Sequence, residues 1–140
     1  MSKELIEKKL EQITQLLAEL SRFFEKSSEE FLRDAVTIRA AERDFQLIVD
    51  IASDLNAHIL VEKGEATPDT YRQSFINLGR AGILPASLAN ELAVSARLRN
   101  ILVHEYDFEE DVGRFYVEAK RFVGAYGLYL TAMREFLNRG

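Results

Sequence analysis

The chain has 140 residues, of which 47% are hydrophobic and 29% are charged, and these proportions are ordinary for one folded domain over residues 1–140. It has no cysteine and only two histidines, which excludes disulfides and thiolate metal sites and leaves little for a transition-metal site. The net charge of −5 argues against a surface that coats nucleic acid broadly, but it allows a small basic cleft on an acidic body.

Apolar residues at alternating steps of three and four predict two long helices in the first half of the chain. The first apolar stripe comprises Leu10, Ile13, Leu17, Leu20 and Phe24. Ser27 and Glu30 then have the spacing of a capping box, so we expect the second helix to start after Ser27. The second stripe comprises Ala41, Phe45, Ile48, Ala52, Leu55 and Ile59. This helix should end near Gly64, because glycine commonly follows a helix C-terminus.

A short third helix is predicted to start at Thr67 and Pro68, with the threonine as its cap and the proline at its first helical position. Its apolar side comprises Tyr71, Phe75 and Leu78. Gly79 and Gly82 should end this helix.

Pro85 is predicted to begin a fourth helix that runs to about Val103. Asp107 and Glu110 have the spacing of a cap pair that opens a fifth helix. The stripe of the fifth helix comprises Val112, Phe115, Ala119, Phe122, Tyr126, Tyr129 and Met133. No alternating strand pattern competes, so we predict an all-α bundle of long antiparallel helices with one short helix inserted.

The N-terminal sequence MSKELIEKKLEQ carries charges throughout, so we do not expect it to be a signal peptide. No apolar run approaches the roughly 18 residues that a membrane-spanning helix needs. We therefore expect no membrane segment and a cytoplasmic location.

Two arginines near the end of the fourth helix are not equivalent. At 100° per residue, the apolar residues of this helix gather in one sector: Leu88, Leu92, Ala96, Leu102 and Val103. Arg99 falls near the middle of that sector, whereas Arg97 falls on the opposite side and should be an ordinary solvated charge. An unpaired charge on a packed surface is costly, so Arg99 needs a partner or lines a cleft.

Asn100, His104 and Tyr106 lie close to Arg99 in the sequence, at the junction of two predicted helices. Asn100 and His104 are four residues apart, so they share one side of the helix next to Arg99. Tyr106 precedes the Asp107 cap, which fixes where the ring projects, and we expect its phenol to be exposed. A purely structural alternative remains open, because a histidine at a helix C-terminus is often only a favourable cation near the helix dipole.

The segment RNILVHEYD at 99–107 resembles the signature of the HEPN superfamily, which is Arg-x4–6-His with a polar residue, often asparagine, after the arginine. The added tyrosine gives Arg-x4-His-x-Tyr, which is similar to the HepT toxin branch. The resemblance covers most of the chain: AAERDFQLIVDIASDLNAHIL is similar to that branch's second helix, and TPDTYRQSFINLGRAGILPASLANEL to its third helix and the entry to the fourth. Arg99, Asn100, His104 and Tyr106 match the motif position for position.

The resemblance implies an all-α HEPN fold, a homodimer, and a ribonuclease site at the dimer cleft that uses no metal and no cofactor. Arg99 and His104 would be its catalytic residues, with Asn100 and Tyr106 in support. The resemblance also implies a partner, a minimal nucleotidyltransferase antitoxin that transfers AMP to the motif tyrosine, here Tyr106.

The residue types suit cleavage of RNA, which supplies its own nucleophile, the 2′-OH. His104 could take that proton or protonate the leaving 5′-oxygen, because imidazole titrates near neutral pH. Arg99 could stabilise charge on the phosphoryl oxygens, and Asn100 could orient His104 or donate to phosphate. One histidine cannot readily be acid and base at once, so two sites facing each other across a dimer make chemical sense.

The alternative function is a non-catalytic helical module that binds a nucleotide or a partner protein. The acidic balance of the chain mildly favours this alternative, and the acidic run at 109–111 is less expected beside a polyanion.

Two other charged pairs lie on the second predicted helix. Asp54 and His58 are four residues apart and should form a surface charge pair, although His58 lining the cleft is an alternative. Arg39 and Arg43 are also four apart and of like sign, which makes them candidates for RNA phosphate contacts, with a solvated face as the alternative. The aromatic residues of the fifth helix should belong to the core or a dimer interface.

Overall fold

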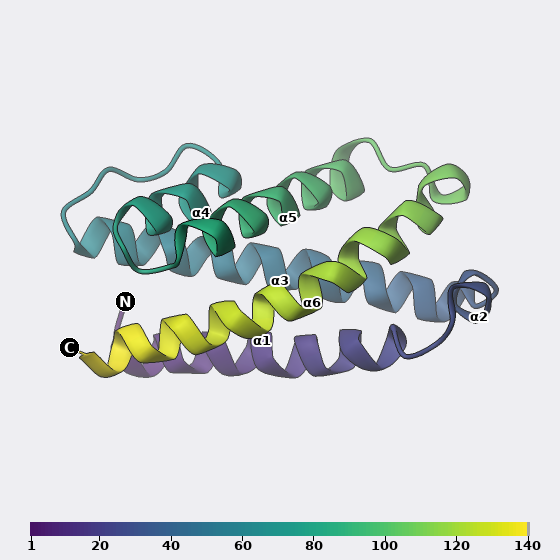
Figure 1. The fold of residues 1–140 in the computed structure, drawn as a ribbon, viewed down its shortest axis with the longest axis horizontal. Helices are drawn as coiled ribbons and strands as arrows, with labels where there is room; N and C mark the ends of the chain where they lie inside the picture. Colours follow the sequence, from purple (N-terminus) through teal and green to yellow (C-terminus); the bar gives the residue numbers. More distant parts are fainter. Residues whose placement is uncertain (140) are drawn as a thin grey trace.

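Four long helices run alternately in opposite directions in the computed structural model, which describes residues 1–139 (Figure 1). They are α1 (Lys3–Phe23), α3 (Ala35–Glu62), α5 (Ala86–His104) and α6 (Phe108–Arg139). Two shorter helices, α2 (Ser28–Leu32) and α4 (Tyr71–Arg80), complete the part of the chain that the structure describes. The expected all-α bundle of antiparallel helices is confirmed.

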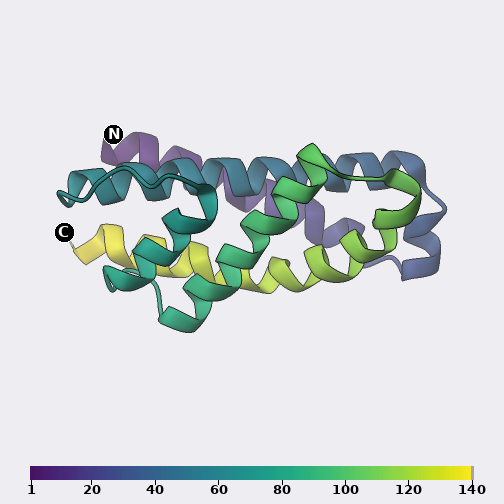
Figure 2. The same cartoon turned by 90° about the horizontal axis from the view of Figure 1, so that it is seen from above.

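The long helices bring the α5–α6 junction close to one end of the bundle. α1 and α6 lie on one side of the bundle and α4 and α5 on the other, with α3 running between them (Figure 1). α5 crosses above α3 at an angle, and the α5–α6 junction lies toward the end that holds α2, while both termini lie at the opposite end (Figure 2). Within residues 1–139, no helix combines the length and the apolar character that crossing a membrane requires.

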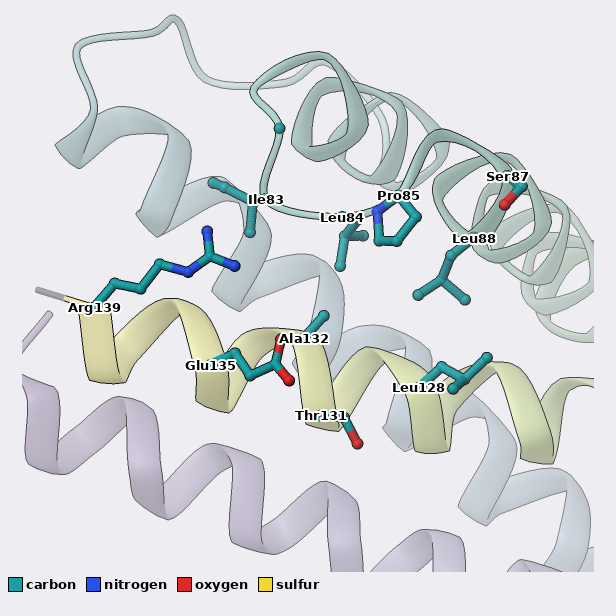
Figure 3. A pocket seen from close by; sticks show the side chains of 11 residues that line it. Ile83, Leu84, Pro85, Ser87, Leu88, Leu128, Thr131, Ala132, Glu135 and Arg139 are labelled. Atoms are coloured by element: carbon teal, nitrogen blue, oxygen red, sulfur yellow. The ribbon is translucent and has the colours of Figure 1, made fainter.

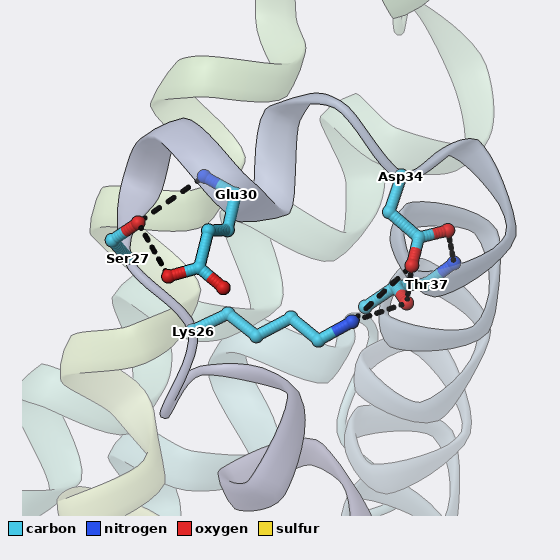
Figure 4. Close-up of polar contacts among 5 residues, drawn as sticks. All are labelled: Lys26, Ser27, Glu30, Asp34 and Thr37. Carbon is cyan, nitrogen blue, oxygen red and sulfur yellow. Dashed lines mark hydrogen bonds and ion pairs between the residues drawn. The ribbon is translucent and has the colours of Figure 1, made fainter.

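The second predicted helix is divided in two, which the sequence did not predict. Ser27 does act as a cap, since its Oγ accepts from the backbone N–H of Glu30 at 3.2 Å, but the helix it opens, α2, ends at Leu32. Asp34 then caps α3: its Oδ1 accepts from the backbone N–H of Thr37 at 3.1 Å, and Lys26 contacts its Oδ2 at 3.2 Å (Figure 4). The hydrogen bonds from Thr37 and the Lys26 ammonium hold the pKa of Asp34 at about 2.

Packing of Phe31 explains why the chain turns between α2 and α3. Its side chain is fully buried, with ring centres 5.6 Å from Phe24 and 5.0 Å from Tyr116 of α6. The break at residues 33–34 accompanies the burial of Phe31 in this aromatic cluster, while α3 packs along α1. Two cap sequences lie seven residues apart, and the tertiary packing uses both of them.

α4 begins later than predicted. Thr70, not Thr67, is the cap, because its Oγ1 accepts from the backbone N–H of Gln73 at 3.0 Å. Gly79 does not end the helix either. It lies inside α4 where a Cβ would come within 2.7 Å of Ala89 Cβ, so its role is the close approach of α4 to α5. Gly82, with φ of +75°, follows the helix as expected.

The fourth and fifth predicted helices are α5 and α6, and both begin where they were expected. The cap of α6 differs in detail from the prediction. Asp107 Oδ1 accepts from the backbone N–H groups of Glu109 and Glu110 at 3.0 and 3.2 Å, and Asp111 is the residue whose side chain reaches back to the Asp107 N–H, at 2.8 Å. This double cap fixes the start of α6 immediately after Tyr106.

The aromatic stripe of α6 lies in the core and carries a buried polar network. The Tyr129 hydroxyl donates to Asn56 Oδ1 at 2.8 Å, and Asn56 Nδ2 donates to Ser74 Oγ at 3.1 Å. The hydroxyls of Tyr126 and Ser95 are 2.7 Å apart. These bonds join α6 to α3, α4 and α5, and a buried network of satisfied partners specifies how the helices are rotated against each other.

One carboxylate is buried between α1 and α3. Asp44 is 6% exposed, and its Oδ2 has no hydrogen-bond partner within residues 1–139. Burial, together with the facing Glu19 carboxyl of α1, raises the pKa of Asp44 to about 7. Because this pKa lies above that of the unfolded chain, the folded state binds the proton more tightly, and Asp44 destabilises the fold as the pH rises.

Replacement of Asp44 by Asn should therefore stabilise the protein in a pH-dependent way. We expect the gain in thermal midpoint to be smallest near pH 4, to grow as the pH rises through the interval between the unfolded and folded pKa values, and to level off above about pH 7. The exposed Asp69→Asn is the control and should show no such growth. Thermal melts from pH 4 to 8 test this, and a gain for Asp44→Asn that does not change with pH would contradict it.

Candidate functional site

Arg99 is held where α3, α4 and α5 meet. Its Nε donates to Oδ1 of Asp50 on α3 at 2.8 Å, and its guanidinium carbon lies 4.8 Å from the centre of the Tyr71 ring at the start of α4. The Arg99 side chain is 15% exposed, whereas Arg97 is exposed, so the predicted difference between the two arginines is confirmed. Asp50 is the partner that a charge on a packed surface requires.

These contacts fix the direction of the guanidinium. The bond to Asp50 occupies its Nε edge and the Tyr71 ring covers one of its faces, while Nη1 also donates to Oδ1 of Asn100 at 3.3 Å. Within residues 1–139 the remaining N–H groups at the Nη end have no other acceptor, so they can bind one from outside the chain. A guanidinium held in this way can offer two parallel donors to a phosphate.

Sequence reasoning did not identify Asp50 or Tyr71. The sequence did indicate that Arg99 needs an acidic partner. It could not show which one, because α3 contains several acidic residues and only the three-dimensional packing determines which of them contacts α5. Helix geometry supplies a second hint, because Arg39, Arg43 and Asp50 fall within about 40° of one another around α3 at 100° per residue. The Arg99–Asp50 contact shows that this edge of α3 faces α5.

Asn100 and His104 lie on the exposed side of the last turns of α5. His104 is the final residue of the helix, and both side chains are exposed. The structure therefore brings Arg99, Asn100 and His104 to one end of α5, with the arginine turned inward and the other two turned to solvent. In a single chain these two side chains reach outward rather than into an enclosed pocket.

Tyr106 differs from its prediction, because its hydroxyl is buried rather than exposed. The residue lies in the short connection between α5 and α6, and its hydroxyl has no hydrogen-bond partner within residues 1–139. Burial raises the pKa of Tyr106 above its ordinary value, and the nearby Glu42 carboxyl of α3 raises it further. The sequence could not show this, because Glu42 lies 64 positions earlier in the chain.

Arg39 lies beside Tyr106 and Arg43 lies one turn further along α3. The Arg39 guanidinium carbon is 4.2 Å from the centre of the Phe108 ring, and Nη1 is 4.0 Å from Glu42 Oε1. Arg39 and Arg43 are both exposed. The edge of α3 next to the motif thus carries two accessible cations.

Two surface cavities lie away from this junction. A cavity of about 490 Å³ lies between the α4–α5 connection and α6, where Ile83 and Leu84 face Leu128, Ala132 and Glu135 (Figure 3). Another, of about 570 Å³, lies near the two termini and is lined by Met1, Glu62, Phe136 and Leu137 among others.

The other predicted charge pair is a surface contact. His58 Nε2 lies 3.9 Å from Asp54 Oδ1, and Lys9 of α1 approaches the second oxygen of the same carboxylate at 3.9 Å. This part of α3 is directed toward α1 rather than toward Arg99. Residues 1–139 contain no group of three or more histidine or carboxylate side chains arranged to hold a metal ion.

A family model and a relative of known name both match this chain, and both carry the name HepT. Residues 10–110 match the model of the family described as "Ribonuclease HepT-like". The chain is 35% identical over 133 residues to a protein of Aphanizomenon flos-aquae (strain 2012/KM1/D3) named tRNA nuclease HepT, and the match covers 95% of this chain and 90% of that protein.

Solved structures share the fold at lower identity. One is a tri-AMPylated HEPN toxin of Shewanella oneidensis in complex with an MNT antitoxin, with a TM-score of 0.68, 20% identity, and coverage of 91% of this chain and 98% of that one. Another is a toxin–antitoxin structure with AMP-PNP, with a TM-score of 0.66, 20% identity, and coverage of 89% and 98%. These structures confirm that the helices are arranged as in HEPN proteins.

Proposed function

The chain belongs to the HepT-like ribonuclease family, and from this premise we propose that it is an endoribonuclease toxin that cleaves RNA through Arg99 and His104 without a metal ion. The observation that carries the proposal is the position of Arg99, oriented by Asp50 and Tyr71 five residues before an exposed histidine on the same helix. The cyanobacterial relative is named a tRNA nuclease, which makes tRNA the first substrate to test.

The proposed reaction uses the 2′-OH of RNA as nucleophile. Its oxygen bonds to the adjacent phosphorus, the bond from phosphorus to the 5′-oxygen of the next nucleotide breaks, and a 2′,3′-cyclic phosphate remains. Arg99 stabilises the charge that develops on the phosphoryl oxygens, and it does so without reorganisation because its guanidinium is already fixed. His104, exposed at the helix end, transfers the proton, and Asn100 donates to phosphate or orients the imidazole.

The same proposal includes a homodimer. One His104 cannot remove the 2′-OH proton and protonate the 5′-oxygen at the same moment, whereas two copies facing each other can divide the two roles. The outward direction of Asn100 and His104 supports a cleft that is completed by a second chain. Arg39 and Arg43, on the α3 edge beside the motif, are proposed to contact the RNA backbone.

The proposed regulator is a nucleotidyltransferase antitoxin of the MNT type. It would transfer AMP from ATP to Tyr106: the Tyr106 oxygen bonds to the α-phosphorus, pyrophosphate leaves, and the phenol proton passes to solvent. Support comes from the AMPylated toxin in the Shewanella complex. The added phosphate would lie near Arg99 and His104 and would repel RNA. We also propose a cytoplasmic location, where RNA and ATP are both present.

We expect RNA to be cleaved in excess chelator, with a 2′,3′-cyclic phosphate product, while DNA remains intact because it lacks the 2′-OH. His104→Ala should lose at least about 10²-fold in rate, the usual scale for a general acid–base group. Arg99→Ala should lose far more than the matched exposed control, Arg97→Ala. Gel analysis of tRNA cleavage measures the activity in chelator and the rates of the His104 and arginine variants. Loss of activity in chelator would refute the mechanism, and binding of RNA without cleavage would favour a non-catalytic module.

The chain should form dimers in solution. Sedimentation velocity at micromolar concentration measures this directly, and we expect a species of twice the 16.0 kDa chain mass. A chain that sediments only as a monomer while it cleaves RNA would show that the site is complete in one chain.

Incubation with a nucleotidyltransferase partner, ATP and magnesium should place AMP on Tyr106 and abolish RNA cleavage. Tyr106→Phe lacks the acceptor oxygen and should remain both unmodified and active. Peptide mass spectrometry locates the modification. If the partner silenced Tyr106→Phe equally well, inhibition would operate through binding alone.

A further inference from the structure

Two buried polar atoms at the motif lack hydrogen-bond partners within residues 1–139. One is the hydroxyl of Tyr106, between α5 and α6, and the other is Oε2 of Glu42 on α3, a residue that is only 8% exposed. A phenol can donate a hydrogen bond and a carboxylate can only accept one, so the two groups are complementary. Neither atom has a partner at hydrogen-bond distance in the described chain, but the Glu42 carboxyl lies close enough to raise the pKa of the Tyr106 phenol, so its charge attracts the phenol O–H dipole.

The neighbours of this pair hold it in place. Arg39 lies 4.0 Å from the other oxygen of Glu42 and stacks on Phe108, the first residue of α6. Asp111 of α6 adds negative charge near the phenol. Burial and the Glu42 carboxyl both raise the pKa of Tyr106, so the phenol stays protonated.

A hydroxyl in this position is closed to group transfer. An attacking oxygen has to approach the phosphorus to about 3–3.5 Å, with the rest of the nucleotide outside the protein surface. The Tyr106 hydroxyl is shut off from solvent by the chain itself. AMP transfer therefore requires that the ring first turn outward.

We propose that Glu42 is a positioning residue that holds the Tyr106 phenol inward and thereby limits how often the tyrosine becomes open to AMP transfer. The proposal rests on the proposed modification of Tyr106. Its consequence is that loss of the Glu42 carboxylate increases the reactivity of Tyr106.

Glu42→Gln tests the proposal with little change in volume, and the matched control is Glu110→Gln, an exposed acid at the same junction. The first measurement uses N-acetylimidazole, a small reagent that acetylates accessible tyrosine hydroxyls, with peptide mass spectrometry. We expect acetylation of Tyr106 to be several-fold faster in Glu42→Gln than in the wild type or the control, because the amide lacks the charge that attracts the phenol O–H. Equal rates would overturn the proposal.

The core tyrosines show whether the variant remains folded. Tyr126 and Tyr129 are buried with hydrogen-bonded hydroxyls, so their acetylation should stay slow in every variant. If Glu42→Gln exposes them as well, Glu42→Asp replaces it, because the shorter side chain keeps the charge but withdraws it from the phenol. Rapid acetylation of Tyr106 alone supports the proposal in either variant, and slow acetylation in a folded variant overturns it.

The second measurement is the rate of AMP transfer by a nucleotidyltransferase partner with ATP and magnesium. The proposal predicts faster modification of Glu42→Gln than of the wild type. Slower modification would make Glu42 the acceptor of the phenol proton and would overturn its positioning role. If wild-type Tyr106 takes no AMP at all, the proposed regulation fails, while the acetylation rates still decide whether Glu42 holds the ring.

Discussion

The ion pair between Arg99 and Asp50 is the contact from which the arrangement of the motif follows. It joins α5 to α3 at 2.8 Å, and the Tyr71 ring brings the start of α4 onto the same guanidinium. A cation in this half-buried position is tolerated only because an acceptor meets it, and the acceptor fixes the rotation of α5. With Arg99 turned inward, Asn100 and His104 are directed to solvent at the end of the helix.

The acidic and basic residues near the motif lie on different helices. The acidic residues 109–111 occupy the first turn of α6, where carboxylates are stabilised by the helix dipole, and Asp111 also accepts the Asp107 N–H. The exposed cations Arg39 and Arg43 lie on the facing edge of α3. A negative chain can thus present a local basic edge beside Arg99, and the acids at 109–111 serve to start a helix immediately after Tyr106.

Periodicity predicted the helices and the direction of Arg99, because both depend on which side of one helix is apolar. Periodicity did not predict the features that depend on residues far apart in the sequence. Burial of Phe31 against Phe24 and Tyr116 divides the second predicted helix at Asp34, and the Glu42 carboxyl raises the pKa of Tyr106 from another helix. Cap signals were also ambiguous, since Thr67 and Thr70 can both begin a helix and the structure uses the second. The proposed site residues Arg99 and His104 were visible in the sequence, whereas Asp50, the partner of Arg99, was not.

The most direct test of this account is a double-mutant cycle on RNA cleavage with Asp50→Asn and Arg99→Ala. If Asp50 acts by orienting Arg99, Asp50→Asn alone should lower kcat/KM by about tenfold, and the double variant should be no slower than Arg99→Ala, because without the arginine there is nothing left to orient. Losses that multiply in the double variant would contradict the account, since Asp50 would then act on RNA or on the fold independently of Arg99.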